Sequence, residues 1–303
     1  MLRLDFVKKP IEQQQKIVDD YYERILEHRD DKRIKRLNEW CETNLYPVLH
    51  KIRTSDNRYI FFEKVIKADY KDLKRIFLYL KEKNLTLPDD EARYMKKTMY
   101  ERAIDKKLFA NNLQVTVCPY CNRNFINSGV KTAGCQLDHF FNKSQYPILA
   151  ASFYNLIPVC ARCNNMKKDE EFVHSPFDPD ISADDLLIFT YWPVTLEYLE
   201  KEDGIEIDIE YLHQKMAIDK DMEILEIKKL YQIHRDRVIE LLKVIMIYDD
   251  IYLSQIVDQY TELFKDSHVL KQIIAGTYVE ESNYIKRPLA KLLSDIGRQC
   301  GFF

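Results

Sequence analysis

Apolar and polar positions alternate with a helical period along most of the chain, and this pattern predicts a mainly helical protein. From Ile11 onward, apolar side chains recur every three or four residues opposite acidic and basic ones. Pro88 is expected to open another helix, because proline suits the first helical position and the acidic residues that follow stabilise the first turn. We predict helices over residues 11–45, 58–83, 88–109, 219–263 and 283–298, and Asp249 with Asp250 favours a break in the fourth.

The middle of the chain has a different pattern, with short apolar runs bounded by turn residues. Residues 136–140 and 155–159 are predicted strands, residues 163–171 a helix, and residues 122–126 a short strand that leads to a turn at residues 127–129. Further on, the runs 187–192, 196–199 and 205–209, with a turn at residues 202–204, predict a small antiparallel sheet. No role for this sheet or for the C-terminal helices follows from the sequence.

Composition and charge narrow the class of protein. The 303 residues are 46% hydrophobic and 31% charged, which is typical of a globular chain with an ample core. A net charge of −3 argues against non-specific binding of duplex through overall charge, so any basic surface must be local. No apolar run is long enough to cross a membrane and no signal peptide is recognisable, so we expect a cytoplasmic protein without a membrane partner.

Four of the seven cysteines form two Cys-x-x-Cys pairs, Cys118 with Cys121 and Cys160 with Cys163. Two such turns supply the four thiolates of a closed, tetrahedral structural Zn²⁺ site. The alternatives are thiols used for core packing or for redox chemistry, although a thioredoxin-like motif needs only one pair. Cys135 lies between the pairs and is either a spare ligand or a buried apolar thiol.

Asp138, His139, Asn155 and Asn164 lie within or directly beside this cysteine framework. Phosphodiester hydrolysis needs a base to deprotonate water and a divalent cation to stabilise the developing charge. An imidazole is neutral and basic near pH 7, which suits His139 to the first role. Asp138 and Asn164 offer hard oxygen ligands, which favour Mg²⁺ or Mn²⁺ over Zn²⁺.

The order Cys-x-x-Cys, Asp-His, Asn, Cys-x-x-Cys resembles the zinc-bearing branch of the HNH endonucleases. The resemblance implies a ββα-metal module in which His139 is the general base and Asp138 binds the catalytic metal. It also implies that Asn155 braces the active-site loop and the His139 ring. The chain departs from the family after the last cysteine, where many members have His and this chain has Asn164. Some members use Asn there as an oxygen ligand to Mg²⁺, so the departure affects the choice of metal.

The stretch LDHFFNKSQYPILAASFYNLIPVC is closer still to the nuclease subunits of Septu-type and retron-linked anti-phage defence systems. That resemblance implies an effector that cuts DNA or RNA during phage infection and works beside an ATPase partner subunit. It covers only the central segment, residues 118–168. The alternative class is a zinc-ribbon module that binds nucleic acid or protein without catalysis.

Basic residues near the last cysteine are candidate contacts for the phosphates of a nucleic-acid substrate. Arg162, Lys167 and Lys168 lie beside Asn164 at the start of a predicted helix, where backbone N–H groups also favour anions. A second basic stretch precedes the first cysteine pair and is more typical of a solvated helix face; it comprises Arg93, Lys96, Lys97, Arg102, Lys106 and Lys107.

Together these patterns predict an α+β, mainly helical fold in which an HNH ββα-metal module with a four-cysteine zinc site is embedded between helical regions. We expect an N-terminal helical region at residues 1–112, the nuclease module at residues 113–175, and a β-hairpin followed by a C-terminal helical region at residues 176–303. The predicted activity is that of a metal-dependent endonuclease with a structural Zn²⁺ and a catalytic Mg²⁺ or Mn²⁺.

Overall fold

The structure is a computed structural model that describes residues 2–52, 59–126, 133–212, 215–264 and 266–303. These residues form two compact units. One unit comprises residues 3–115 and 126–179, and the other comprises Leu2, residues 116–125 and residues 180–303. The described residues are mainly helical, with two small two-stranded sheets, as the sequence predicts.

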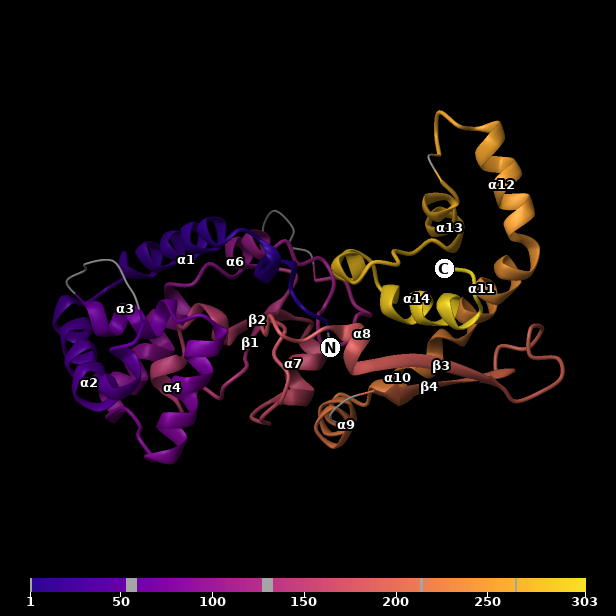
Figure 1. Cartoon of the computed structure of the whole chain (residues 1–303). Helices are drawn as coiled ribbons and strands as arrows, with labels where there is room; N and C mark the ends of the chain where they lie inside the picture. Colours follow the sequence, from indigo (N-terminus) through magenta and orange to yellow (C-terminus); the bar gives the residue numbers. More distant parts are fainter. Residues whose placement is uncertain (1, 53–58, 127–132, 213–214, 265) are drawn as a thin grey trace. The chain divides into compact units, whose positions relative to one another are not determined.

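The N-terminal part of the first unit is a set of short helices (Figure 1). The long helices predicted over residues 11–45, 58–83 and 88–109 are each interrupted. Residue 58 and the predicted turn at residues 127–129 lie outside the described residues. The observed elements are α1 (Ile11–Leu26), α2 (Asp31–Leu49), α3 (Ile60–Lys67), α4 (Tyr70–Glu82), α5 (Asp89–Tyr94), the π-helix η2 (Met95–Arg102) and α6 (Lys106–Leu113).

The interruptions have a common cause, which is an aspartate that caps the next helix. Asp30, Asp69 and Asp105 each accept hydrogen bonds from backbone N–H groups in the first turn of α2, α4 and α6. A capping residue has an extended backbone, so a helix cannot run through it. The apolar spacing continues across each break because both helices pack their apolar sides into the same core.

The central segment forms a strand pair followed by a helix. β1 (Gln136–His139) pairs antiparallel with β2 (Leu156–Val159), with Asp138 opposite Ile157 and His139 opposite Leu156. Two 3-10 turns, η3 (Pro147–Leu149) and η4 (Phe153–Asn155), lie in the connection between the strands. α7 (Ala161–Lys167) follows β2 and packs against β1. The short strand predicted at residues 122–126 is reduced to an isolated bridge between Val117 and Phe125.

The core of the first unit is rich in aromatic rings that pack behind the connection between β1 and β2. Phe153 of η4 lies at its centre, with ring centroids 5.3 Å from Phe6, 5.3 Å from Tyr21 and 5.0 Å from Phe109. Such contacts combine a large buried apolar area with favourable tilted or edge-on geometry. The N-terminal helices therefore form the base on which the central segment is built.

The second unit contains the predicted hairpin and the C-terminal helices. β3 (Leu187–Pro193) pairs antiparallel with β4 (Ile205–Tyr211), whereas residues 196–199 form turns and not a strand. Figure 1 shows α14 lying along this hairpin, which it contacts through β3. The helices are α8 (Ala183–Leu186), α9 (Lys215–Ile224), α10 (Ile227–Tyr231), α11 (Arg235–Ile247), α12 (Asp250–Gln259), α13 (Ser267–Ala275) and α14 (Ala290–Gln299).

Two boundaries in this unit follow from simple backbone chemistry. The break favoured at Asp249 and Asp250 is confirmed, since the Asp249 side chain accepts from Tyr252 N and caps α12. The last helix begins later than predicted, at Ala290, because Pro288 holds the preceding Arg287 in an extended conformation. None of the helices in the described ranges is both long and apolar enough to span a bilayer.

Candidate functional site

His139 is the last residue of β1, and its ring is held by the loop that leads to β2. Its Nε2 lies 3.0 Å from the carbonyl oxygen of Ala150. A carbonyl oxygen can only accept, so Nε2 carries the proton and donates it. Nδ1 is then the unprotonated nitrogen. The backbone thus selects the tautomer in which Nδ1 can accept a proton from a substrate water.

Asn155 ties together the two ends of the same loop. Its Oδ1 accepts from Phe141 N at 2.7 Å, and its Nδ2 donates to Phe141 O at 3.1 Å and to Leu149 O at 2.9 Å. Asn155 is completely buried, so these bonds are shielded from water. Since Leu149 precedes Ala150, Asn155 fixes the carbonyl that holds the His139 ring.

Side chains from the N-terminal helices hold this loop from behind. Tyr21 of α1 donates from its hydroxyl to Ala151 O at 2.8 Å, and Ser152 donates to Val65 O of α3 at 2.9 Å. Both bonds are buried. The helical region therefore orients His139 indirectly, through the backbone of residues 150–152.

Asp138 forms a buried ion pair with Lys167 of α7. The ammonium lies 3.2 Å from Asp138 Oδ2 and donates to the carbonyl oxygen of His139 at 2.9 Å. The side chains of Lys167 and Asp138 are 1% and 3% exposed. This pair connects α7 to β1 and places a positive charge beside the carboxylate predicted to bind metal.

Lys167→Met should lower the free energy of unfolding by roughly 3–5 kcal/mol, because the buried Asp138 carboxylate then loses the ammonium group that faces it. Urea unfolding of the purified protein measures the loss. Lys168→Met is the matched control, since the neighbouring side chain is exposed and its replacement should change stability little. Equal stability of the two variants would contradict the pairing.

The other residues predicted around α7 are less buried. Asn164 is half-buried, and its Nδ2 donates to Gln136 Oε1 at 2.6 Å, which leaves its amide oxygen as the atom available to a cation. Arg162 is half-buried and Lys168 is exposed at the end of the helix. Contacts of Arg162, Lys167 and Lys168 with phosphate stay a prediction, and the inward position of Lys167 makes it the least accessible of the three.

The four predicted zinc ligands come together. The sulfur atoms of Cys118, Cys121, Cys160 and Cys163 all lie within 4.8 Å of one another, and all four residues are buried. Zn–S bonds of about 2.3 Å in a tetrahedron require sulfurs at this kind of separation. The donor set therefore fits a closed site for a metal such as zinc. Cys135 is buried but is not part of this cluster, and burial raises the pKa of its thiol.

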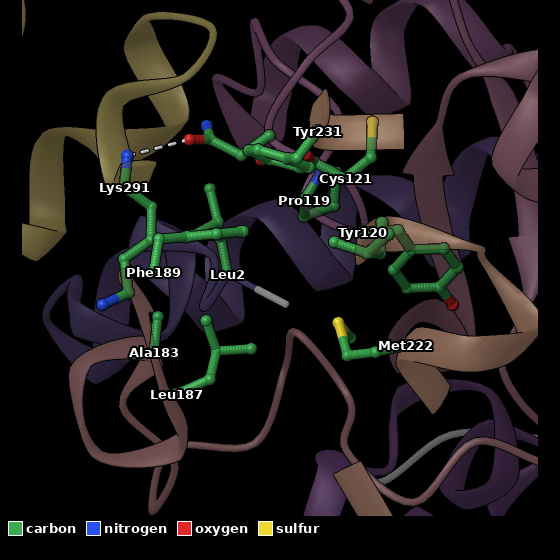
Figure 2. A pocket seen from close by; sticks show the side chains of 12 residues that line it. Leu2, Pro119, Tyr120, Cys121, Ala183, Leu187, Phe189, Met222, Tyr231 and Lys291 are labelled. Carbon is green, nitrogen blue, oxygen red and sulfur yellow. Dashed lines mark hydrogen bonds between the residues drawn. The ribbon is translucent and has the colours of Figure 1, made fainter. Parts of the chain in front are cut away.

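The turn between Cys118 and Cys121 is held by distant parts of the chain. The Tyr231 hydroxyl donates to the Cys121 carbonyl at 2.6 Å. Asn122 donates to Tyr284 O at 2.8 Å, and its Oδ1 accepts from Lys291 N at 3.0 Å. Figure 2 shows Tyr231, Cys121 and Lys291 among the side chains that line a small, largely apolar pocket. The C-terminal helices, which had no role in the sequence, thus support the first cysteine pair.

Tyr100 of the π-helix η2 is a site residue that local sequence patterns do not reveal. Its ring meets the His139 ring edge-on, with centroids 4.3 Å apart, and its hydroxyl donates to Leu137 O at 3.1 Å. Burial, and then the charge of Asp138, raises the pKa of Tyr100 to about 12. The phenol is therefore neutral, and its ring packs against the His139 ring. Single-turn π-helices are frequent at functional sites, but the aromatic residue itself reads as a core residue in the sequence.

The environment of His139 strongly favours the neutral imidazole. Burial, followed by the nearby Lys143, lowers the pKa of His139 to about 3, while the Ala150 carbonyl acts in the opposite direction. Lys167 and Lys106 lower it further. His139 therefore stands in a cationic environment on a chain whose net charge is only −3.

The comparison with protein families agrees with this arrangement. Residues 118–170 match the family model of the HNH endonucleases. This segment contains the cysteine pairs, the strands β1 and β2, and α7. The match supports a nuclease of the HNH type, which acts on nucleic acid and generally uses a divalent metal. No curated protein and no solved structure matched the chain.

Proposed function

We propose that the protein is a metal-dependent endonuclease that hydrolyses phosphodiester bonds of DNA or RNA. The observation that carries the proposal is the held tautomer of His139 inside a segment that matches the HNH endonucleases. A fixed ring with an unprotonated Nδ1 has the geometry that a general base requires, whereas the burial that lowers the pKa of His139 to about 3 makes it a weaker base than the sequence alone predicts.

In this proposal, His139 Nδ1 takes a proton from water as the water oxygen attacks phosphorus. The bond from phosphorus to the leaving oxygen breaks, and that oxygen is protonated from solvent. Asn155 acts through the loop backbone, because it positions the Ala150 carbonyl that holds the ring. Asp138 and Asn164 would hold Mg²⁺ or Mn²⁺, which when bound stabilises negative charge on the phosphate and the leaving oxygen.

The donor set suits a weakly held hard cation. Asp138 supplies one carboxylate and Asn164 one neutral amide oxygen, so water and substrate phosphate would complete the coordination. The Lys167 ammonium competes with a cation for Asp138. The four-cysteine site has a separate, structural role, because four thiolates leave zinc no open position.

Replacing Asn164 should change the metal preference of cleavage. Asn164→His supplies an imidazole nitrogen, so we expect a shift away from Mg²⁺ toward Ni²⁺ or Zn²⁺. Asn164→Ala removes a ligand and should lower activity with every metal. A metal titration of cleavage by the three proteins measures both effects, and Asn165→Ala, on the exposed side of α7, is the control. An Asn164→Ala variant as active as the parent in Mg²⁺ would exclude Asn164 as a ligand.

The decisive test of the function is a cleavage assay. Purified protein is incubated with circular DNA, linear duplex, single-stranded DNA and RNA, each with Mg²⁺, with Mn²⁺ and without added metal. We expect metal-dependent internal cuts in at least one substrate. Internal cuts are recognised as conversion of circular to linear DNA, which an exonuclease cannot produce.

The second candidate is a zinc-bearing module that binds nucleic acid or protein without catalysis. The burial of Asp138 and its pairing with Lys167 favour this candidate, because a neutralised carboxylate is a poor metal ligand. Binding of nucleic acid without cleavage under any metal condition would support it.

We further propose that the nuclease is an effector of anti-phage defence that works with an ATPase partner. This rests on the resemblance of the segment around Asp138 and His139 to such nuclease subunits. The test is a pull-down with the protein as bait, followed by a measurement of phage protection in bacteria that express the protein together with any ATPase recovered. Protection that persists with His139→Ala would contradict an effector role for the nuclease.

A further inference from the structure

Two lysines from different elements lie near the ring of Tyr100, which packs against His139. Lys143 Nζ lies 4.3 Å from the centroid of Tyr100, and Lys106 Nζ lies 5.6 Å from it. Lys143 follows β1 in a turn closed by Asn142, whose Oδ1 accepts from Ser144 N. Lys106 is the first residue of α6. Tyr100 itself is fixed by its hydroxyl bond to Leu137 O, so the ring is a rigid platform for both ammonium groups.

Both ammonium groups remain available to an anion. Two carboxylates act to raise the pKa of Lys143, and both are already paired, Glu101 with Lys97 at 3.0 Å and Asp138 with Lys167 at 3.2 Å. In the described part of the chain, neither Lys106 nor Lys143 forms an ion pair, whereas Lys167 is buried against Asp138. Both lysines are half-buried, and their charges are near enough to His139 to lower its pKa.

The local electrostatics agree with an anion site. Burial lowers the pKa of Lys143, and the charges of Lys106 and Lys97 act in the same direction. Cations held close together repel one another, and an anion that binds between them relieves that repulsion. The chain as a whole is slightly acidic, so this concentration of positive charge is a local feature.

We propose that Lys106 and Lys143, positioned on Tyr100, form a phosphate-binding site that seats the nucleic-acid backbone beside His139. The inference deepens the proposed nuclease function and names residues that contact the substrate. It moves the main phosphate contacts away from Lys167 to lysines on two other elements. The ligand is the phosphodiester backbone, so the site is indifferent to base sequence.

The test is the salt dependence of binding, measured without Mg²⁺ or Mn²⁺ so that no cleavage occurs. Fluorescence anisotropy with labelled duplex and single-stranded oligonucleotides gives the slope of log K against log salt. Each phosphate contact contributes about 0.9 to that slope for duplex and about 0.7 for single strands. Lys106→Gln/Lys143→Gln should therefore reduce the slope by about 1 per lysine and weaken binding to all sequences alike.

The matched control is Lys35→Gln/Lys83→Gln, which removes the same charge from exposed lysines paired with Glu39 and Glu82. We expect this control to keep the parental slope. Lys106→Arg/Lys143→Arg keeps both positive charges and should retain most of the parental salt slope. That result would show that the Gln variant binds less well because it has lost charge and not because it has unfolded. A Gln variant with the slope of the control would overturn the proposal.

The same measurement separates this proposal from the nuclease proposal. If the Gln double variant has a smaller salt slope than the parent and the parent cleaves no substrate, the phosphate site is supported and the nuclease proposal is refuted. If the Gln double variant keeps the parental salt slope and the parent cleaves with Mg²⁺, the phosphate site is refuted and the nuclease proposal is supported.

Discussion

His139→Ala should lower the rate of cleavage by at least ~100-fold, the typical contribution of a positioned general base. The expectation follows from the geometry, since the Ala150 carbonyl accepts from Nε2 and leaves Nδ1 as the proton acceptor. The measurement is a single-turnover cleavage assay at saturating metal. Because His139 is expected to act in the chemical step, the affinity of the variant for the oligonucleotide should stay close to that of the parent.

His139 is buried, so its replacement requires a check on folding. Zinc content and the thermal melt should stay near those of the parent, because the cysteine ligands are untouched. His268→Ala is the matched control, as this histidine lies on the surface of α13 and pairs with Glu280. Cleavage by His139→Ala at the parental rate would remove His139 from the mechanism.

Loss of the zinc site should unfold the segment that carries the catalytic residues. Structural zinc in small modules contributes roughly 10–16 kcal/mol of apparent binding free energy, which exceeds the net stability of most domains, about 5–15 kcal/mol. Among its described residues, the segment between the cysteine pairs has only two four-residue strands and two three-residue 3-10 turns as regular structure, so we expect the zinc to be needed in addition to its packing on the N-terminal helices. We expect Cys160→Ser to lose zinc, and to lose cleavage with it.

Elemental analysis of protein prepared without chelator gives the zinc content, which should be one ion per parental chain. Hydrogen exchange then reports whether residues 136–167 lose protection in Cys160→Ser. Cys300→Ser and Cys135→Ser are the controls, because neither residue belongs to the cluster, and both variants should keep their zinc. Parental protein without zinc would refute the assignment, and zinc loss in Cys135→Ser would make Cys135 a ligand.

The residues of the candidate site could be predicted because they occupy short, local patterns. A Cys-x-x-Cys turn brings two sulfurs together within four residues, and the buried strand β2 is an apolar run in the sequence. The helix ends were also encoded locally. Asp30, Asp69 and Asp105 are good capping residues, but the apolar period continues across them and masks the breaks.

The environment of those residues was decided only by the tertiary structure. Lys167 reads as a surface lysine near a phosphate, yet α7 packs on β1 and turns the ammonium toward Asp138. Tyr100, Lys106 and Lys143 lie on separate elements, and only packing brings them beside His139.

The contacts that hold the first cysteine pair were also decided only by the tertiary structure. Tyr231 donates to the Cys121 carbonyl, and Asn122 is hydrogen-bonded to Tyr284 and Lys291. Periodicity reports which face of an element is buried, but it carries no information about which distant element covers that face. The sequence by itself therefore predicted the four cysteines that come together, and it named the candidate base. The tertiary structure decided the tautomer of the base, the partner of the carboxylate and the charges around them, because these depend on contacts between residues far apart in the chain.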